Sequence, residues 1–119
     1  SHVVSLHCPL TAETRNLIGH DELARMREDA ILVNAARGGI VDEAALLHAV
    51  QSGQIAGAVV DVLTSEPPRQ GNPLLDAALP NLLVTPHIAW ASTTSRQQLA
   101  NELAGNIRAW RSGTPRNLV

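Results

Sequence analysis

Residues 30–52 read AILVNAARGGIVDEAALLHAVQS, and this stretch decides the fold. Its apolar opening, residues 30–35, predicts a β-strand. The two glycines that follow permit a tight turn, and Asp42 is placed to cap a helix over residues 43–52 whose apolar positions share one face. Gly53 stands where a glycine after a helix is favoured. A strand that leads directly into a helix indicates an α/β protein with a parallel sheet.

The same alternation continues in both directions along the chain. Apolar runs predict three further strands, at residues 3–7, 55–62 and 81–85, and the first of them is expected to be buried. Helical spacing and caps predict a short helix over residues 22–27 after Asp21, one helical turn over 74–79, and a long final helix after Ser92. The expected fold is α/β: a parallel sheet of four strands with flanking helices on both faces, half of a doubly wound Rossmann-like domain.

The first expected strand has no turn before it, which suggests that earlier strand–helix units are missing. A G-x-G-x-x-G turn opens a dinucleotide-binding domain, and no three glycines of this sequence have that spacing. Without those units one edge of the sheet is expected to be exposed, and the isolated chain is then expected to associate or to be unstable.

Composition narrows the class of protein. The 119 residues suffice for one modest domain, and a net charge of -2 gives no basic surface for nucleic acid. No apolar run is long enough to cross a membrane. Cys8 is the single cysteine, so no internal disulfide can form, and a reducing compartment such as the cytoplasm is expected. The sequence has a single cysteine and no two histidines at helical spacing, so no pattern in it indicates a metal site.

Three residues whose side chains can bind a substrate or transfer a proton each follow an apolar run: Arg37, Glu66 and His87. The carboxyl ends of parallel strands are where ligands bind in such sheets. A guanidinium can hold a carboxylate, an imidazole can move a proton near neutral pH, and a carboxylate can orient the imidazole and stabilise its protonated form. This set suits the reduction of a 2-keto acid. Taken singly, each also has a structural interpretation, as a solvated arginine, an exposed loop acid or a histidine that follows a strand.

Four motifs in order resemble one known family over nearly the whole chain. They are VVSLHCPLT (3–11), NAARGGIVDEAAL (34–46), GAVVDVLTSEPP (57–68) and NLLVTPHIAW (81–90). Together they resemble the D-isomer-specific 2-hydroxyacid dehydrogenases. HIAWAS (87–92) is most similar to the glycerate dehydrogenase (hydroxypyruvate reductase) branch, since the phosphoglycerate branch usually has a glycine-rich stretch there. The formate dehydrogenases of this superfamily usually carry Gln where Glu66 stands.

The resemblance implies roles for particular residues. Arg37, Glu66 and His87 would be catalytic, and the substrate would contact Arg37, His87 and Trp90. NAD or NADP would be the cofactor. The residues that the resemblance places near that cofactor are His7, Cys8, Pro9, Thr14, Ala35, Ala36, Arg37, Asp61, His87 and Ala89. Residues 1–105 would be the second half of the cofactor domain, and residues 106–119 would belong to the substrate domain.

The function expected from the resemblance is hydride transfer between NAD(P)H and a small 2-keto or 2-hydroxy acid, such as hydroxypyruvate or glyoxylate. A homodimer is usual in the family. Two alternatives stay open: a D-3-phosphoglycerate dehydrogenase, and a dinucleotide-sensing corepressor scaffold similar to the C-terminal binding proteins. The isolated chain is expected to be inactive, because most cofactor affinity would be lost without the phosphate-binding turn.

Overall fold

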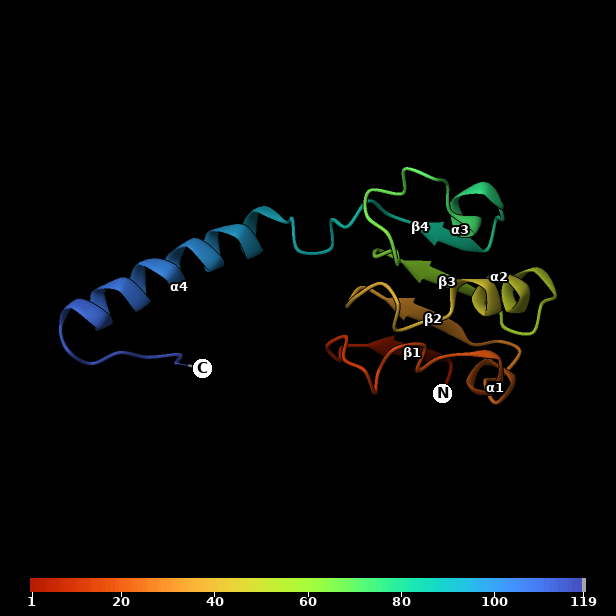
Figure 1. Cartoon of the computed structure of the whole chain (residues 1–119), viewed down its shortest axis with the longest axis horizontal. Helices are drawn as coiled ribbons and strands as arrows, with labels where there is room; N and C mark the ends of the chain where they lie inside the picture. Colours follow the sequence, from red (N-terminus) through yellow and green to blue (C-terminus); the bar gives the residue numbers. More distant parts are fainter. Residues whose placement is uncertain (119) are drawn as a thin grey trace. The chain divides into compact units, whose positions relative to one another are not determined.

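The computed structural model describes residues 1–118 and divides into two compact units, Ser1–His87 and Ile88–Val119 (Figure 1). The first unit holds a sheet and three helices, and the second holds one long helix. The assignment of residues 106–119 to a different domain stays a prediction.

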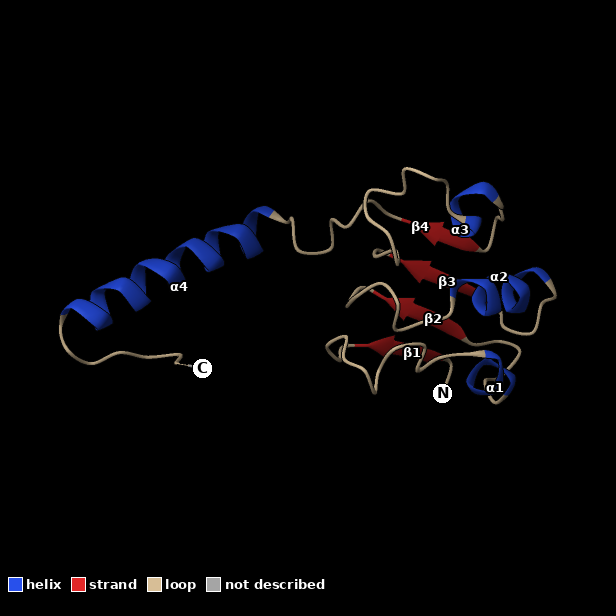
Figure 2. Ribbon diagram, in the orientation of Figure 1, coloured by secondary structure: helices blue, strands red, loops and turns tan. Residues whose placement is uncertain are grey.

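The first unit is a four-stranded parallel sheet in the order β1-β2-β3-β4 (Figure 2). The strands are β1 (Val3–Leu6), β2 (Ile31–Asn34), β3 (Gly57–Val60) and β4 (Leu82–Val84). The helices between them are α1 (His20–Ala24), α2 (Glu43–Gln51) and α3 (Pro73–Asp76). The parallel α/β fold is confirmed, and each strand is shorter than its apolar run because the run continues into the loop.

One face of this sheet carries the core. The register aligns its inward side chains in rows across the strands, and these residues are buried or half-buried: Val4, Leu6, Leu32, Asn34, Ala58, Val60, Leu82 and Val84. They pack with apolar residues of the helices in a single cluster that includes Leu23, Leu46 and Leu74. Full burial of one leucine or valine side chain in this cluster contributes about 1.5–3 kcal/mol to folding.

The opposite face is exposed within residues 1–87, so helices on both faces are not found there. Val3 is 54% exposed, Ile31 39% and Leu83 56%. The physical reason is topological: consecutive strands added in one direction by right-handed crossovers place every connecting helix on the same side. A doubly wound sheet needs a reversal of strand order, which these four strands lack. The expectation that the first strand is buried is wrong for the same reason, and because β1 is an edge strand.

Local signals explain the helix boundaries. Asp42 caps α2 by accepting the N–H groups of Ala44 and Ala45, both at 3.0 Å, as predicted. Gly53 follows α2 with φ +73°, also as predicted. The prediction that Asp21 caps the first helix is wrong. The cap residue is Gly19, because Glu22 folds back to accept the Gly19 N–H at 3.0 Å.

α3 begins one residue earlier than predicted and ends three residues sooner. Its cap is Asn72, whose side chain accepts the Leu74 N–H at 2.9 Å, and Pro73 occupies the first turn, where its missing N–H is not needed. This short helix lies between the loop that carries Glu66 and strand β4.

The second unit contains α4 (Thr93–Arg111), capped by Ser92 as predicted. The Ser92 hydroxyl accepts the Ser95 N–H at 3.1 Å. The apolar stripe along α4 is exposed in this unit: Leu99, Leu103, Ile107 and Trp110. In residues 1–118, no helix combines the length and the apolar character that crossing a membrane requires.

Candidate active site

The loops that follow the four strands carry the predicted site residues of the first unit. All four strands are parallel, so their carboxyl ends lie along one edge of the sheet (Figure 2). The loop after β1 begins at His7, the loop after β2 carries Arg37, the loop after β3 carries Glu66, and His87 follows β4. Residues distant in sequence are therefore brought to one edge, as the motif positions predict.

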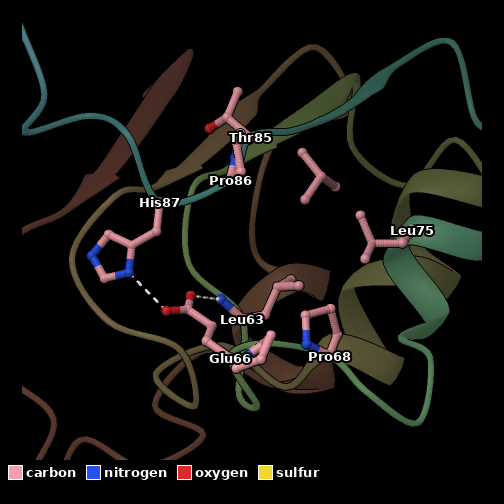
Figure 3. Close-up of a pocket in the computed structure, with 9 residues that line it drawn as sticks. Leu63, Glu66, Pro68, Leu75, Thr85, Pro86 and His87 are labelled. Carbon is pink, nitrogen blue, oxygen red and sulfur yellow. Dashed lines mark hydrogen bonds and ion pairs between the residues drawn. The ribbon is translucent and has the colours of Figure 1, made fainter.

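Glu66 and His87 form a direct pair. The Nδ1 atom of His87 lies 2.7 Å from Oε2 of Glu66. The second carboxylate oxygen, Oε1, accepts the Leu63 N–H at 2.6 Å (Figure 3). The side chains of His87 and Glu66 are 41% and 34% exposed, so a ligand can reach the ring. The carboxylate is thus fixed to its own loop on one side and orients the imidazole on the other.

The carboxyl group of Glu66 is biased toward its ionised form. Burial raises its pKa, but the Leu63 N–H bond and the contact with His87 lower it by more, so the pKa lies below its usual value of 4.5. An ionised carboxylate only accepts hydrogen bonds. Nδ1 of His87 is therefore the donor in this pair, and Nε2 is the ring nitrogen that can exchange a proton with a ligand.

The backbone at His87 is strained. Its φ is +54°, in the left-handed region that a residue with a Cβ rarely adopts. The His87 N–H donates to the Thr85 carbonyl at 3.0 Å, which closes a tight turn around Pro86. Such strain costs about 1–2 kcal/mol and clusters at functional sites. The turn directs the imidazole toward Glu66.

A cavity of about 430 Å³ adjoins the pair (Figure 3). Apart from Glu66, Thr85 and His87, its lining is apolar: Leu63, Pro67, Pro68, Leu75, Val84 and Pro86. The Glu66–Pro67 peptide bond is cis. An apolar surround weakens the screening of charges and so strengthens the interaction of Glu66 with His87.

The Arg37 loop is held by a buried side chain that the sequence analysis did not single out. Asn34 is 2% exposed; its amide donates to the Arg37 carbonyl at 3.0 Å, and its oxygen accepts the Ala36 N–H at 3.2 Å. The exposed Arg37 side chain donates from Nη1 to the Ala36 carbonyl at 2.7 Å. In the part of the chain that the structure describes, no hydrogen bond or ion pair joins this guanidinium to Glu66 or His87.

The Arg37 loop nevertheless touches the Glu66 loop through their backbones. A Cβ placed on Gly38 would lie 1.9 Å from the Leu63 carbonyl oxygen and 2.6 Å from the Thr64 nitrogen. Only glycine permits this approach. Gly38 therefore lets the loop after β2 lie against the base of the loop after β3, next to the N–H that holds Glu66.

Six of the residues predicted to bind a cofactor line a second cavity, of about 670 Å³. They are His7, Cys8, Pro9, Ala35, Ala36 and Arg37, and Leu10 completes the lining. Thr14 does not line it; its hydroxyl donates to the carbonyl of Pro9, which does, at 2.7 Å. Four of the lining side chains, Cys8, Pro9, Ala35 and Ala36, are small, so the cavity has room for part of a dinucleotide, which fits the implied cofactor. The glycine-rich phosphate turn is not in this sequence.

The remaining predicted site residues lie elsewhere. Asp61 directly follows β3 and is 4% exposed, and the Thr85 hydroxyl donates to its carboxylate. Ala89 and Trp90 belong to the second unit, where Trp90 is 58% exposed. Their roles near a ligand stay predictions. In residues 1–118 no group of three or more histidine, cysteine or acidic side chains is arranged to hold a metal ion.

Comparison with known proteins identifies the family. Residues 1–89 match the family model described as "D-isomer specific 2-hydroxyacid dehydrogenase, NAD binding domain". The chain belongs to this family. The resemblance found in the four sequence motifs is thereby confirmed.

Individual relatives are similar over the whole chain. Glycerate dehydrogenase from Methylorubrum extorquens is 55% identical over 119 residues, which are 100% of this chain and 38% of that protein. Glyoxylate reductase from Korarchaeum cryptofilum is 47% identical over 120 residues, which are 100% of this chain and 36% of that protein. The chain thus spans less than half of these relatives.

Among solved structures, a D-isomer specific 2-hydroxyacid dehydrogenase from Lactobacillus delbrueckii ssp. bulgaricus, in its NAD complexed form, superposes with a TM-score of 0.86. It is 34% identical, and the match covers 100% of this chain and 40% of that one. The predicted Rossmann-like fold is confirmed by this likeness.

Proposed function

We propose that this chain supplies the catalytic acid and part of the cofactor site of a dehydrogenase that interconverts a small 2-keto acid and its D-2-hydroxy acid. Hydroxypyruvate and glyoxylate are the proposed substrates, with D-glycerate and glycolate as the products. The observation that carries the proposal is the Nδ1–Oε2 contact of 2.7 Å between His87 and Glu66 at the carboxyl edge of the sheet. The names of the relatives, glycerate dehydrogenase and glyoxylate reductase, favour these acids.

The proposed roles follow from the chemistry of each side chain. Arg37 binds the substrate carboxylate through its planar fork, which orients the keto carbon. His87, protonated on both nitrogens, donates from Nε2 to the keto oxygen and transfers that proton as the oxygen gains charge. Glu66 accepts the Nδ1–H and keeps the ring in place throughout, as the third member of other acid–base relays does.

A nicotinamide dinucleotide, when bound, supplies the hydride that adds to the keto carbon. The keto carbon gains a C–H bond, and the electron pair of the C=O π bond moves onto the oxygen. The oxygen then takes the proton of His87 and becomes a hydroxyl. The lining of the second cavity, from His7 to Pro9 and from Ala35 to Arg37, would hold the dinucleotide. Asp61 is proposed to form a hydrogen bond with the nicotinamide carboxamide or a ribose, and Thr14 to lie near a phosphate or a ribose. Ala89 is proposed to contact the cofactor. Trp90 is proposed to wall the substrate pocket.

The cofactor is proposed to be NAD or NADP, and the whole enzyme is proposed to be a cytoplasmic homodimer. The isolated chain is proposed to be inactive and either to associate or to be unstable. Sedimentation that finds a stable monomer, or micromolar NAD affinity by calorimetry, would contradict that proposal.

A chimeric enzyme tests the proposed activity. Residues 1–119 replace the aligned 38% of the M. extorquens glycerate dehydrogenase, and oxidation of NADH and NADPH is followed with hydroxypyruvate or glyoxylate. Turnover is expected with at least one pair. It should fall by at least about 100-fold in His87→Ala, since general acid catalysis contributes about 10²–10⁴-fold.

The parent glycerate dehydrogenase serves as the control for folding and cofactor quality. A folded chimera that binds dinucleotide but shows no turnover would refute the reductase proposal and favour a dinucleotide-sensing scaffold. Full activity in His87→Ala would refute the assigned role of the histidine.

A further inference from the structure

Glu43 makes two long-range hydrogen bonds that the proposed function does not use. This half-buried residue opens α2. Its Oε1 accepts the Thr64 N–H at 2.7 Å, and its Oε2 accepts from the Asn72 side-chain amide at 2.8 Å. The two donors are 21 and 29 residues further along the chain. One carboxylate thus ties the start of a helix to both ends of a distant segment.

That segment, residues 64–72, carries Glu66. The Thr64 N–H is adjacent to Leu63, whose own N–H holds Oε1 of Glu66 at 2.6 Å (Figure 3). At the other end, Asn72 is 6% exposed and caps α3, which carries Leu75 of the apolar cavity. The bonds of Glu43 therefore fix both ends of the loop on which the catalytic carboxylate sits.

Helix capping does not account for Glu43. Asp42 already satisfies two N–H groups in the first turn of α2. An acidic residue in that turn also interacts favourably with the helix dipole, but this needs neither Thr64 nor Asn72. The two distant partners call for a different explanation.

We propose that Glu43 is a positioning residue for the Glu66–His87 pair: it clamps the loop after β3 so that the Glu66 carboxylate meets the imidazole. Its catalytic importance rests on the proposed function, whereas the clamp itself is a property of this chain. Glu43 acts through the loop and touches neither substrate nor cofactor.

A reciprocal exchange of side chains gives a sharp test in the chimeric enzyme, in which the chain is part of a whole dehydrogenase. In Glu43→Gln the new amide can accept only one of the two donors and turns an NH₂ group toward the other. Adding Asn72→Asp restores the second hydrogen bond with the roles exchanged: the new amide at position 43 donates, and the new carboxylate at position 72 accepts. That carboxylate can still cap α3. The exposed Glu28, replaced by Gln, is the matched control.

The readouts are the pKa of the Glu66 carboxyl, followed by ¹³C NMR, and the hydrogen exchange of the Leu63 amide. In Glu43→Gln the pKa of Glu66 should rise toward its usual value of 4.5, because the Leu63 N–H and His87 contacts loosen. Exchange of the Leu63 amide should accelerate by about tenfold, as expected for loss of a hydrogen bond that holds a local unit closed. The double variant should restore both, and Glu28→Gln should change neither.

Unchanged Glu66 titration and Leu63 exchange in folded Glu43→Gln would overturn the proposal, and so would a double variant that fails to restore them. Should Glu43→Gln alone not fold, the double variant decides: a titration of Glu66 like that of the starting chain supports the clamp, and a raised pKa refutes it. An inactive chimera would refute the proposed function and leave these readouts untouched, so the two failures are distinguishable.

Discussion

Replacing Gly38 by alanine should both destabilise the first unit and disturb Glu66. The added Cβ would lie 1.9 Å from the Leu63 carbonyl oxygen, 2.2 Å from its carbon and 2.6 Å from the Thr64 nitrogen. Because real Cβ atoms essentially never lie closer than 3.0 Å to another heavy atom, the two backbone segments must separate by at least about 1.1 Å. The atoms in the way are backbone, so no rotamer change relieves the clash.

The expected cost is about 2–3 kcal/mol of unfolding free energy, the upper part of the range for overpacking. The assay is urea denaturation followed by far-UV circular dichroism and by NMR signals of β3. Fluorescence is unsuitable because Trp90 and Trp110 both lie in the second unit. In the chimeric enzyme the same displacement should lower kcat by about 100-fold, since a misplacement near 1 Å has effects of this order.

Gly19→Ala is the matched control, because a Cβ there meets its nearest atom at 3.6 Å, which is ordinary contact. Because Gly19 is the N-cap of α1, where alanine is disfavoured, its cost should be about 1 kcal/mol or less. A Gly38→Ala chain within about 0.5 kcal/mol of the starting chain, well inside the range for substitutions that break no packing, would refute the account of how the two loops meet.

Three further predictions concern single residues. Asn34→Ala should cost about 1–3 kcal/mol in urea denaturation, because it leaves the Ala36 N–H and Arg37 carbonyl without their buried partner; an unchanged midpoint would contradict this. The pKa of Glu66 lies below its usual 4.5 in the folded state, so its contribution to stability is present above that pH and is lost as the pH falls through the folded value. Denaturation midpoints from pH 7 to 3 should therefore fall less steeply in Glu66→Gln, and an equal slope would count against the assigned contacts. His87→Gly should be more stable than His87→Ala by about 1 kcal/mol, since glycine adopts φ +54° without strain. In the chimeric enzyme both variants should lose at least about 100-fold in turnover; equal stability would mean that the turn is unstrained.

Much of the fold followed from local sequence signals. Residues 30–53 gave β2, the Asp42 cap and the glycine after α2, because each signal acts within a few residues. The face on which the helices pack is set by strand order, a long-range property that periodicity does not encode. The cap of α1 was misplaced because the Glu22 side chain, and not the residue type at the cap position, satisfies the helix start.

The candidate site was predictable in part. Motif order located Glu66 and His87, and the structure brings these two side chains into contact. The supports of the site, Asn34, Gly38 and Glu43, act on backbone groups of other loops, and no spacing rule predicts such partners. Asn34 carried the one available signal, since a polar residue that ends an apolar strand needs buried partners.

Arg37, Glu66 and His87 are proposed to act on one substrate. The most direct measurement is a crystal structure of the chimeric enzyme with NADH and oxamate, an unreactive 2-keto acid analogue. We expect the Arg37 guanidinium to bind the oxamate carboxylate, and Nε2 of His87 to lie within about 3 Å of the oxygen that corresponds to the keto group. Oxamate bound away from His87, or an Arg37 side chain that still donates to the Ala36 carbonyl, would contradict this proposal.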